Sequence, residues 1–316
     1  MATRRVVTVF GGSGFIGRYV VQRLARLDYV VRVPTRIPDR VRPLITQGRV
    51  GQIVPLGLDL GDDAEIARTV QGAEVVINLV GILAERRPGD FQRLQAEAAG
   101  RIARAAAAAG VSRLVQLSAI GAENGSDSLY ARSKAAGEDA VRAGFPGATI
   151  LRPSIVFGPE DQFFNRFAGL SRVLPVLPVV GAATRFQPVY VGDVADAVIA
   201  AITREDTPGK TYELAGPRVA TFRELMEMML DIVGRRRRVV EVPAGLARLQ
   251  ARLGEFLPNP PLTRDQILLL QHDNVPSGRV PGLQELGIVP HSLESILPGY
   301  LNRFRPGGGR RRTRTE

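Results

Sequence analysis

One short segment near the start of the chain constrains its fold more than any other. Val6–Phe10 is an apolar run rich in β-branched residues, as in a buried strand. Gly11, Gly14 and Gly17 follow at G-x-x-G-x-x-G spacing, and Arg18–Leu27 then carries apolar residues at helical spacing. A strand, a glycine turn and a helix in this order are typical of the first unit of a dinucleotide-binding domain.

Each glycine has a physical reason in such a turn. A pyrophosphate lies against backbone N–H groups at the positive end of the following helix. A side chain at Gly11 or Gly14 would obstruct that approach or the tight turn, and Gly17 lets the helix pack closely on the strand. The alternative is a glycine-rich turn without a ligand, which three glycines at fixed spacing at a strand end disfavour.

Alternating strand and helix patterns fill the first half of the chain. They predict an α/β fold, namely a Rossmann-type doubly wound parallel sheet with helices on both faces. After the glycine unit, strands are expected at Val30–Val33, Ile53–Leu56, Val75–Leu79, Leu114–Ser118 and Thr149–Arg152, and helices at Ala64–Val70, Phe91–Ala109 and Leu129–Ala143.

Beyond residue 152, proline- and glycine-rich stretches replace this alternation, except for an apolar helical pattern within Val189–Ile202. The change predicts a smaller, interleaved C-terminal α/β domain. The Rossmann domain is expected to comprise residues 1–155 and 186–215, the small domain residues 156–185 and 216–300, and residues 301–316 are expected to form a basic, flexible tail.

The composition excludes several classes of site. The chain has no Cys, so disulfides, thiol nucleophiles and thiolate metal sites are excluded. Its two histidines, His272 and His291, lie far along the chain from the glycine turn, so neither a metal site nor a Ser-His-Asp triad is expected.

The net charge of +11 includes arginine clusters at Arg235–Arg238 and from Arg303 to the C-terminus. They suit an acidic partner or an anionic membrane surface, or are simply a solvated basic face. A nucleic-acid partner is not expected, because no aromatic residues are interleaved with the basic ones. The most apolar run, Val173–Ala183, is too short for a membrane span, and no signal-peptide pattern precedes the first strand, so we expect a reducing, cytosolic compartment.

The residues after the second expected strand distinguish the two nicotinamide dinucleotides. An acid there binds the ribose hydroxyls, whereas an arginine suits a 2′-phosphate. No acid is present, but Arg36 is, with Arg32 and Arg40 near it, which predicts NADP(H) bound through Arg36 unless these arginines are only exposed basic residues. Asp59-Leu60 closes the third strand, where a side chain can meet the adenine; the alternative for Asp59 is a helix N-cap.

Tyr130 and Lys134 form a second constellation. Residues at positions i and i+4 of a helix share one face. A nearby ammonium favours the phenolate, which makes Tyr130 a usable proton donor or acceptor beside a hydride transfer, while Lys134 can hold the nicotinamide ribose. Tyr-x-x-x-Lys is common on helix surfaces, but its place after a glycine turn and before another apolar strand gives it weight.

Taken together, these motifs resemble the extended and atypical branch of the short-chain dehydrogenase/reductase superfamily. They are G-G-S-G-F-I-G, Asp59-Leu60, N-L-V-G from residue 78, Ser118, Tyr130 with Lys134, and Arg152-Pro153. The resemblance implies catalytic roles for Ser118, Tyr130 and Lys134 and a bound nicotinamide dinucleotide. The cofactor contacts that it implies are Gly11, Ser13, Gly14, Phe15, Ile16, Gly17, Arg36, Asp59, Leu60, Asn78, Val80, Tyr130, Lys134 and Pro153.

Longer segments are similar to a narrower family, the nucleotide-binding accessory subunits of respiratory complex I. Arg152–Phe167 and Pro261–Val275 carry this similarity and are not general features of the superfamily. The resemblance implies a tightly bound NADPH, docking among other subunits of the hydrophilic arm near the quinone site, and no turnover. For a bacterial-type version, it implies a peripheral position at the cytoplasmic face of the inner membrane.

Two departures from the pattern of extended reductases favour binding over catalysis. Ser118 is followed by Ala119 where a second serine is usual, and the segment between Ser118 and Tyr130 is short. Ser118 can therefore also be interpreted as a strand-end residue bonded to backbone. The alternative function is an active NADP-dependent reductase or epimerase for a sugar nucleotide or an isoprenoid-like substrate, and a weaker one is a regulator that reads the NADPH/NADP⁺ ratio.

Overall fold

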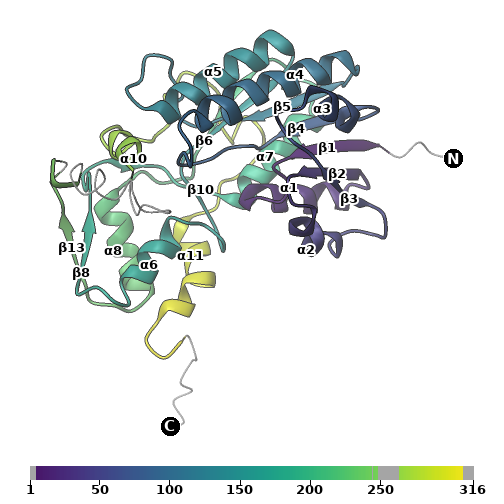
Figure 1. Ribbon diagram of the computed structural model, residues 1–316. Helices are drawn as coiled ribbons and strands as arrows, with labels where there is room; N and C mark the ends of the chain where they lie inside the picture. Colours follow the sequence, from purple (N-terminus) through teal and green to yellow (C-terminus); the bar gives the residue numbers. More distant parts are fainter. Residues whose placement is uncertain (1–4, 244, 248–262, 309–316) are drawn as a thin grey trace. The chain divides into compact units, whose positions relative to one another are not determined.

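A computed structural model describes residues 5–243, 245–247 and 263–308 of the chain. It divides into two compact units, each built from three segments of the sequence and both visible in Figure 1. The first unit comprises Met1–Pro153, Val191–Leu214 and Pro276–Val289, and the second comprises Ser154–Tyr190, Ala215–Val275 and Pro290–Glu316. None of the helices in the described ranges has the length and the apolar content that a bilayer span requires.

The first unit is built on a seven-stranded sheet with the order β11-β6-β5-β4-β1-β2-β3. Each neighbouring pair of strands is parallel, so the predicted doubly wound Rossmann-type fold is confirmed. The strands are β1 (Val6–Phe10), β2 (Val30–Thr35), β3 (Ile53–Gly57), β4 (Val75–Asn78), β5 (Arg113–Leu117), β6 (Thr149–Pro153) and β11 (Thr211–Leu214).

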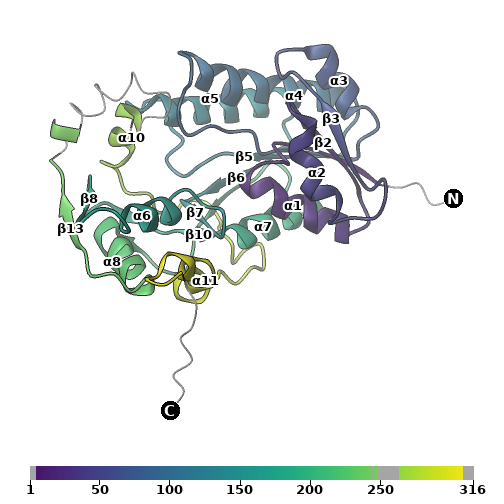
Figure 2. The ribbon, with the colours of Figure 1, turned by 60° about the horizontal axis from the view of Figure 1, so that its bottom comes forward.

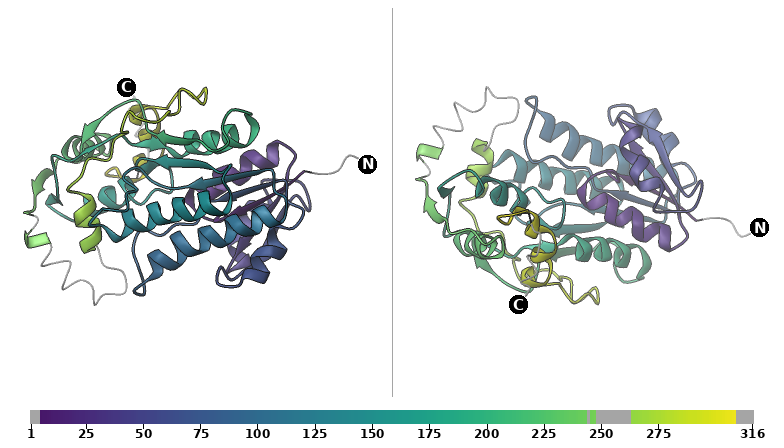
Figure 3. Two further views of the ribbon diagram at one scale, coloured as in Figure 1. Left: turned by 90° about the horizontal axis from the view of Figure 1, so that it is seen from above. Right: turned by 90° about the horizontal axis from the view of Figure 1, so that it is seen from below.

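Helices cover both faces of this sheet, as the opposite views of Figure 3 show. α3, α4 and α5 form one layer, and α1 packs against α7 on the other face. α1 begins at Phe15, earlier than the sequence pattern predicted, because Gly14 in the turn is its N-cap. The helices of this unit are α1 (Phe15–Arg26), η1 (Pro38–Val41), α2 (Arg42–Ile45), α3 (Asp63–Val70), α4 (Ala98–Ala108), α5 (Leu129–Gly144) and α7 (Val191–Thr203).

The single helix expected over residues 91–109 is divided. Its first part, η2 (Gln92–Glu97), is a π-helix that continues into α4. Gly137 of α5 faces this wide turn, and a Cβ there would lie 2.2 Å from the carbonyl oxygen of Gln95. Glycine therefore allows the π-turn to pack directly against α5. Such turns are frequent at functional sites.

Residues 276–289 belong to the first unit, whereas the sequence pattern placed them in the small domain. They run beside the edge strand β11, where the N–H of Glu213 donates to the carbonyl oxygen of Pro281 at 2.9 Å. The Glu213 carboxylate accepts the N–H and the hydroxyl of Ser277 at 2.5 and 2.9 Å. Contacts of one buried carboxylate leave no periodic signal in the sequence, which explains the difference.

The second unit has its own apolar core, surrounded by α6, α8 and α11 in Figure 2. Phe163 stacks on Phe222 with ring centroids 5.4 Å apart, and the Tyr300 hydroxyl donates to the buried Asp161 carboxylate. Its elements are β7 (Val156–Phe157), α6 (Phe164–Leu170), β8 (Val176–Val179), β9 (Arg185–Phe186), β10 (Val189–Tyr190), β12 (Ala220–Thr221), α8 (Phe222–Ile232), β13 (Arg238–Glu241), α10 (Arg264–Leu269), α11 (Leu293–Leu301) and η3 (Asn302–Phe304).

The first part of the expected basic tail is folded. Leu301 ends α11, and the short helix η3 follows it. The Nε of Arg305 then donates to the carbonyl oxygen of Ile232, the last residue of α8, at 2.7 Å. The remaining arginines, from Arg310 onward, lie outside the described residues.

Candidate functional site

The strand order of the sheet reverses between β1 and β4, and the loops that leave these two strands touch. Gly11 follows β1 with a φ of +76°, in the left-handed region that favours glycine. A Cβ at this position would lie 2.9 Å from the carbonyl carbon of Leu79, the first residue after β4. In doubly wound sheets, ligands bind in the crevice at this switch point.

The rest of the glycine turn is limited by space. A Cβ at Gly17 would lie 2.3 Å from the carbonyl oxygen of Gly11 and 2.6 Å from the Cα of Gly12, so only glycine fits. Gly14 caps α1 without a side-chain hydrogen bond, and the first turn of α1 holds no acid. The first N–H groups of α1 are thus left for an anion such as a pyrophosphate. The other predicted contacts of the turn, Ser13, Phe15 and Ile16, are half-buried.

The two arginines of β2 and its end have different environments. Arg32 lies within the strand, and its Nη1 donates to the carbonyl oxygens of Thr69 and Gln71 at 3.2 and 2.6 Å. Arg36 follows the strand directly and is exposed. Because β2 is the neighbour of β1, Arg36 lies at the same edge of the sheet as the glycine turn. Arg32 is therefore held by backbone, and Arg36 keeps the position predicted for a 2′-phosphate ligand.

Asp59 and Leu60 follow β3 at this edge. The Oδ1 of Asp59 accepts the N–H of Gly61 at 2.9 Å, and the N–H of Asp59 donates to the Glu65 carboxylate at 2.8 Å. The N-cap of α3 is Asp62, whose Oδ1 accepts the N–H of Glu65 at 3.0 Å. The alternative interpretation of Asp59 as the helix N-cap is therefore wrong.

Asn78 shapes the loop after β4. This buried residue donates from Nδ2 to the Oε1 of Gln116 at 2.8 Å and accepts the N–H of Val80 on Oδ1 at 3.1 Å. The next residue, Gly81, approaches α5 so closely that a Cβ there would lie 3.1 Å from the Nζ of Lys134. The structure thus brings the predicted residues Asn78, Val80 and Lys134 into one region.

Tyr130 and Lys134 lie on α5, as the spacing predicted. The helix begins with an N-cap at Ser128, whose hydroxyl accepts the N–H of Ala131 at 3.2 Å. The Nζ of Lys134 is 5.8 Å from the centroid of the Tyr130 ring, and Phe91 meets this ring edge-on at 5.8 Å between centroids. The phenol and the ammonium are therefore held as neighbours.

Burial lowers the pKa of Lys134 to about 8, and the nearby Glu138 carboxylate opposes this shift. Glu138 is only 1% exposed and binds the Arg152 guanidinium through two hydrogen bonds of 2.7 Å each. Arg142 donates to the same carboxylate at 3.1 Å. Since two arginines share this carboxylate, Glu138 stabilises the lysine cation only in part, and Lys134 is a cation that releases its proton readily.

Two buried polar atoms near this edge have no hydrogen-bond partner in the described part of the chain. They are the Oγ of Ser118 and the Oε1 of Gln95. The N–H of Ser118 donates to the carbonyl oxygen of Leu151 at 2.7 Å, so its backbone is bonded but its hydroxyl is not. Gln95 donates from Nε2 to Ser133 at 3.0 Å, and its Oε1 would lie 3.4 Å from a Cβ at Gly81. Unpaired buried polar atoms are costly, so both indicate space for a polar ligand.

We refer to Gln95, Ser118, Tyr130 and Lys134 as the polar cluster. Sequence reasoning missed Gln95, because its orientation depends on the π-turn of η2. The one signal was its spacing, because Gln95 follows Phe91 by four residues and so falls on the apolar face of the expected helix. Pro153, also predicted as a cofactor contact, ends β6, and its carbonyl oxygen accepts the N–H of Ile120 at 3.0 Å.

The glycine turn and the polar cluster fit a nicotinamide dinucleotide. The turn has N–H groups in position for a pyrophosphate, and the cluster would offer a hydroxyl, an amide oxygen and an ammonium to the ribose and its ring. Among the residues that the structure describes, no group of three or more histidines and acids could hold a metal ion.

Comparison with known proteins places these features in a family. The NAD dependent epimerase/dehydratase family matches residues 7–215. A solved dTDP-glucose 4,6-dehydratase from Streptomyces venezuelae with bound NAD shares the fold, with a TM-score of 0.72 and 21% identity over 95% of this chain and 96% of its own.

Closer relatives in sequence cover most of the chain. The mitochondrial NADH dehydrogenase [ubiquinone] 1 alpha subcomplex subunit 9 of Arabidopsis thaliana is 39% identical over 96% of this chain and 79% of its own length. A ceramide reductase of Caulobacter vibrioides is 36% identical over 77% of this chain and 76% of its own. The chain therefore belongs to the NAD dependent epimerase/dehydratase family, in the group that contains the alpha subcomplex subunit 9 proteins.

Proposed function

We propose that the chain is an accessory subunit of respiratory complex I that holds NADPH without turning over a substrate. The observation that carries the proposal is the 39% identity to a complex I subunit over almost the whole chain. The proposed site adds a physical role, because a ligand that binds only the folded state stabilises it.

Different residues of the first unit bind different parts of the nucleotide. The N–H groups at the start of α1 bind the pyrophosphate, and Arg36 binds the 2′-phosphate. Asp59 and Leu60 lie beside the adenine, at the end of β3. Ser118, Lys134 and the loop from Asn78 to Gly81 hold the nicotinamide end. When bound, the nicotinamide ring supplies hydride chemistry, which this subunit does not use.

The proposed partners are the other subunits of the hydrophilic arm near the quinone site. The proposed location is the peripheral, cytoplasmic face of the inner membrane in a bacterial-type complex. Arg235–Arg238 supports a contact with an anionic surface, since Arg236 and Arg238 are exposed.

Purification of complex I from the native source tests the proposal. We expect this chain in the intact enzyme at one copy per complex, and a mass spectrum of the nucleotide released from it should show NADPH. An intact, active enzyme without this chain would refute the role as a subunit, whereas release of NAD⁺ alone would refute only the choice of nucleotide.

A second candidate function is an NADP-dependent reductase or epimerase. Two observations favour it: the complete set of Ser118, Tyr130 and Lys134, and the similarity to a ceramide reductase. In that case Tyr130 would move the proton and Lys134 would keep the phenol and the ribose in place. Tyr130→Phe should then abolish nucleotide-dependent turnover and leave nucleotide affinity unchanged. Equal rates of nucleotide oxidation by the variant and the wild type, across candidate substrates, would exclude this function.

A further inference from the structure

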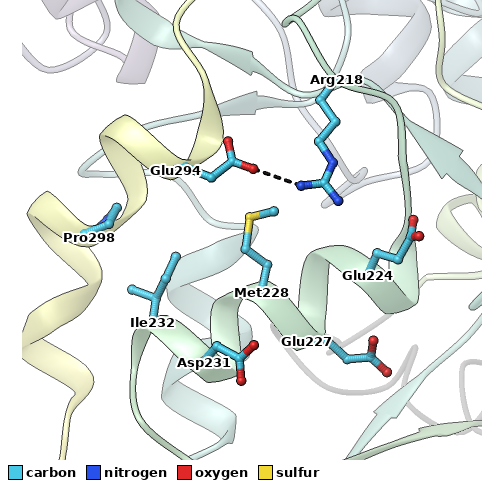
Figure 4. A pocket seen from close by; sticks show the side chains of 8 residues that line it. All are labelled: Arg218, Glu224, Glu227, Met228, Asp231, Ile232, Glu294 and Pro298. Atoms are coloured by element: carbon cyan, nitrogen blue, oxygen red, sulfur yellow. Dashed lines mark hydrogen bonds and ion pairs between the residues drawn. The ribbon is translucent and has the colours of Figure 1, made fainter.

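The second unit carries a groove between α8 and α11, with a cavity volume of about 460 Å³. Figure 4 shows its walls: Arg218 at one end, the side chains of α8 along one side, and Glu294 and Pro298 of α11 along the other. Its apolar lining residues are Met228, Ile232 and Pro298. We call it the acidic groove, because four of its lining residues are Glu224, Glu227, Asp231 and Glu294.

The groove has an excess of negative charge in a chain with a net charge of +11. Its lining includes one cation, Arg218, which pairs with Glu294 at 2.9 Å. Glu224 accepts the N–H of Thr221 at 2.7 Å as part of a capping box. Glu227 and Asp231 are exposed, and the structure records no hydrogen bond or ion pair of their side chains with described residues. These two carboxylates lie four residues apart on α8 and share one face.

The end of the described chain lies beside this groove. Arg305 donates to the carbonyl oxygen of Ile232, which lines the groove, and Arg235 donates to the carbonyl oxygen of Phe304 at 3.1 Å. The next residues of the sequence, after Gly308, are G-R-R-R-T-R-T-E. Four arginines therefore follow within a few residues of a point that is fixed next to the carboxylates.

We propose that the acidic groove binds the C-terminal segment of this same chain, Gly309–Glu316. Six extended residues span roughly 20 Å, and the seven steps from Glu224 to Asp231 rise only about 10 Å along the helix. The segment is thus long enough to follow the groove from Ile232 toward Arg218. The stems of the arginines can pack on Met228 and Pro298 while their guanidinium groups pair with the carboxylates.

The covalent link between the segment and the end of the described chain strengthens this contact, although each arginine–carboxylate pair would be exposed. Single exposed ion pairs are weak. A short covalent connection, however, raises the local concentration of the arginines to the millimolar range, so that several weak ion pairs suffice. Binding of this kind also withholds four guanidinium groups from any other acidic surface.

Because the chain contains no cysteine, disulfide trapping in the full-length protein tests the proposal directly. Met228→Cys and Thr313→Cys place one thiol in the groove and one in the segment, and leave all four acidic lining residues in place. A matched control pairs Thr313→Cys with Val173→Cys, which is 79% exposed and also lies in the second unit. Circular dichroism verifies that each variant is folded.

We expect the disulfide within one chain to form about tenfold faster for the groove pair than for the control pair. The advantage should disappear at about 1 M salt, because the Debye length is then roughly 3 Å and the ion pairs are screened. At low salt, Asp231→Asn should also reduce the advantage of the groove pair, whereas Glu123→Gln, an exposed change in the first unit, should not. Equal rates for the two pairs would overturn the proposal. Disulfides that form only between two chains would also overturn it and assign the groove to a second copy.

Discussion

The glycine turn and the polar cluster lie at the same edge of the sheet, but different forces determine their residues. At Gly11 the backbone of the loop after β4 occupies the space of a side chain, and at Gly17 the backbone of the turn itself does so. In the polar cluster, by contrast, Ser118 and Gln95 keep polar atoms without partners, and Lys134 is buried at the cost of a lowered pKa. The turn is therefore required for folding, whereas the cluster stores a cost that a bound polar ligand can offset.

The largest effect is expected where the turn has no space. Gly17→Ala would place a methyl group 2.3 Å from the carbonyl oxygen of Gly11, so the turn must move. We expect a loss of about 3 kcal/mol in the free energy of unfolding and loss of nucleotide binding. The matched control is Gly14→Ala, whose methyl group would lie 3.1 Å from the same oxygen at a negative φ.

Urea unfolding, with and without NADPH, measures both glycine variants. Gly14→Ala should lose less than about 1 kcal/mol of stability. Equal losses for the two variants would contradict the claim that the close backbone contact makes Gly17 harder to replace than Gly14.

The next largest effect concerns the polar cluster and is the pH dependence of the free energy of unfolding that Lys134 causes. In the unfolded chain Lys134 keeps its proton up to its usual pKa of 10.5, whereas the folded protein releases it above about 8. Folding therefore releases a proton between these two pH values, and the free energy of unfolding should rise with pH across this window.

The contribution of Lys134 to this rise in the free energy of unfolding can be isolated with Lys134→Met, which keeps the volume of the side chain and removes the titrating group. Between pH 8 and 10.5 the wild type should gain up to about 3 kcal/mol relative to this variant. Below pH 8 the variant should be the more stable protein, since it buries no charge. Parallel pH profiles of the two proteins in chemical denaturation would contradict a buried, easily deprotonated lysine.

Arg36 tests whether the turn region also selects the nucleotide. Arg36→Leu should weaken NADPH binding by about 30-fold and leave NADH binding almost unchanged, because only NADPH carries the 2′-phosphate. Arg32→Leu serves as the control, since its guanidinium is held by the carbonyl oxygens of Thr69 and Gln71. Titration of nucleotide fluorescence measures both affinities. A similar loss for NADPH and NADH would remove Arg36 from the 2′-phosphate site.

Sequence patterns predicted those parts of the molecule that depend on local patterns in consecutive residues. The strands β1 to β6 follow from apolar runs, and the glycine spacing located the turn after β1, because each of these signals lies in consecutive residues. The π-turn that orients Gln95 was not predicted, since it changes the helical register by one residue without changing the composition. The segment 276–289 was assigned to the other domain for a similar reason, as one carboxylate, Glu213, holds it beside β11.

The same limit applies within the site. The sequence placed Arg32 and Arg36 together as candidates, but the hydrogen bonds that occupy Arg32 come from the end of α3, more than thirty residues further on. It also left a helix N-cap open as the alternative role of Asp59, although Asp62 is the residue that accepts the N–H of Glu65. Long-range partners of polar side chains decide such cases, and a single sequence does not display them.

The smallest expected effect is the most direct test of the stored cost. Ser118→Ala removes a hydroxyl that is 4% exposed and has no partner among the described residues. Without nucleotide, the free energy of unfolding should stay equal or rise by up to about 1 kcal/mol, whereas nucleotide affinity should fall about fivefold. Ser171→Ala is the matched control, because Ser171 is equally buried but donates to the carbonyl oxygen of Ala168 at 2.7 Å. It should lose about 1 kcal/mol of stability and no affinity, so a loss of stability in both variants would mean that Ser118 serves the fold and not the ligand.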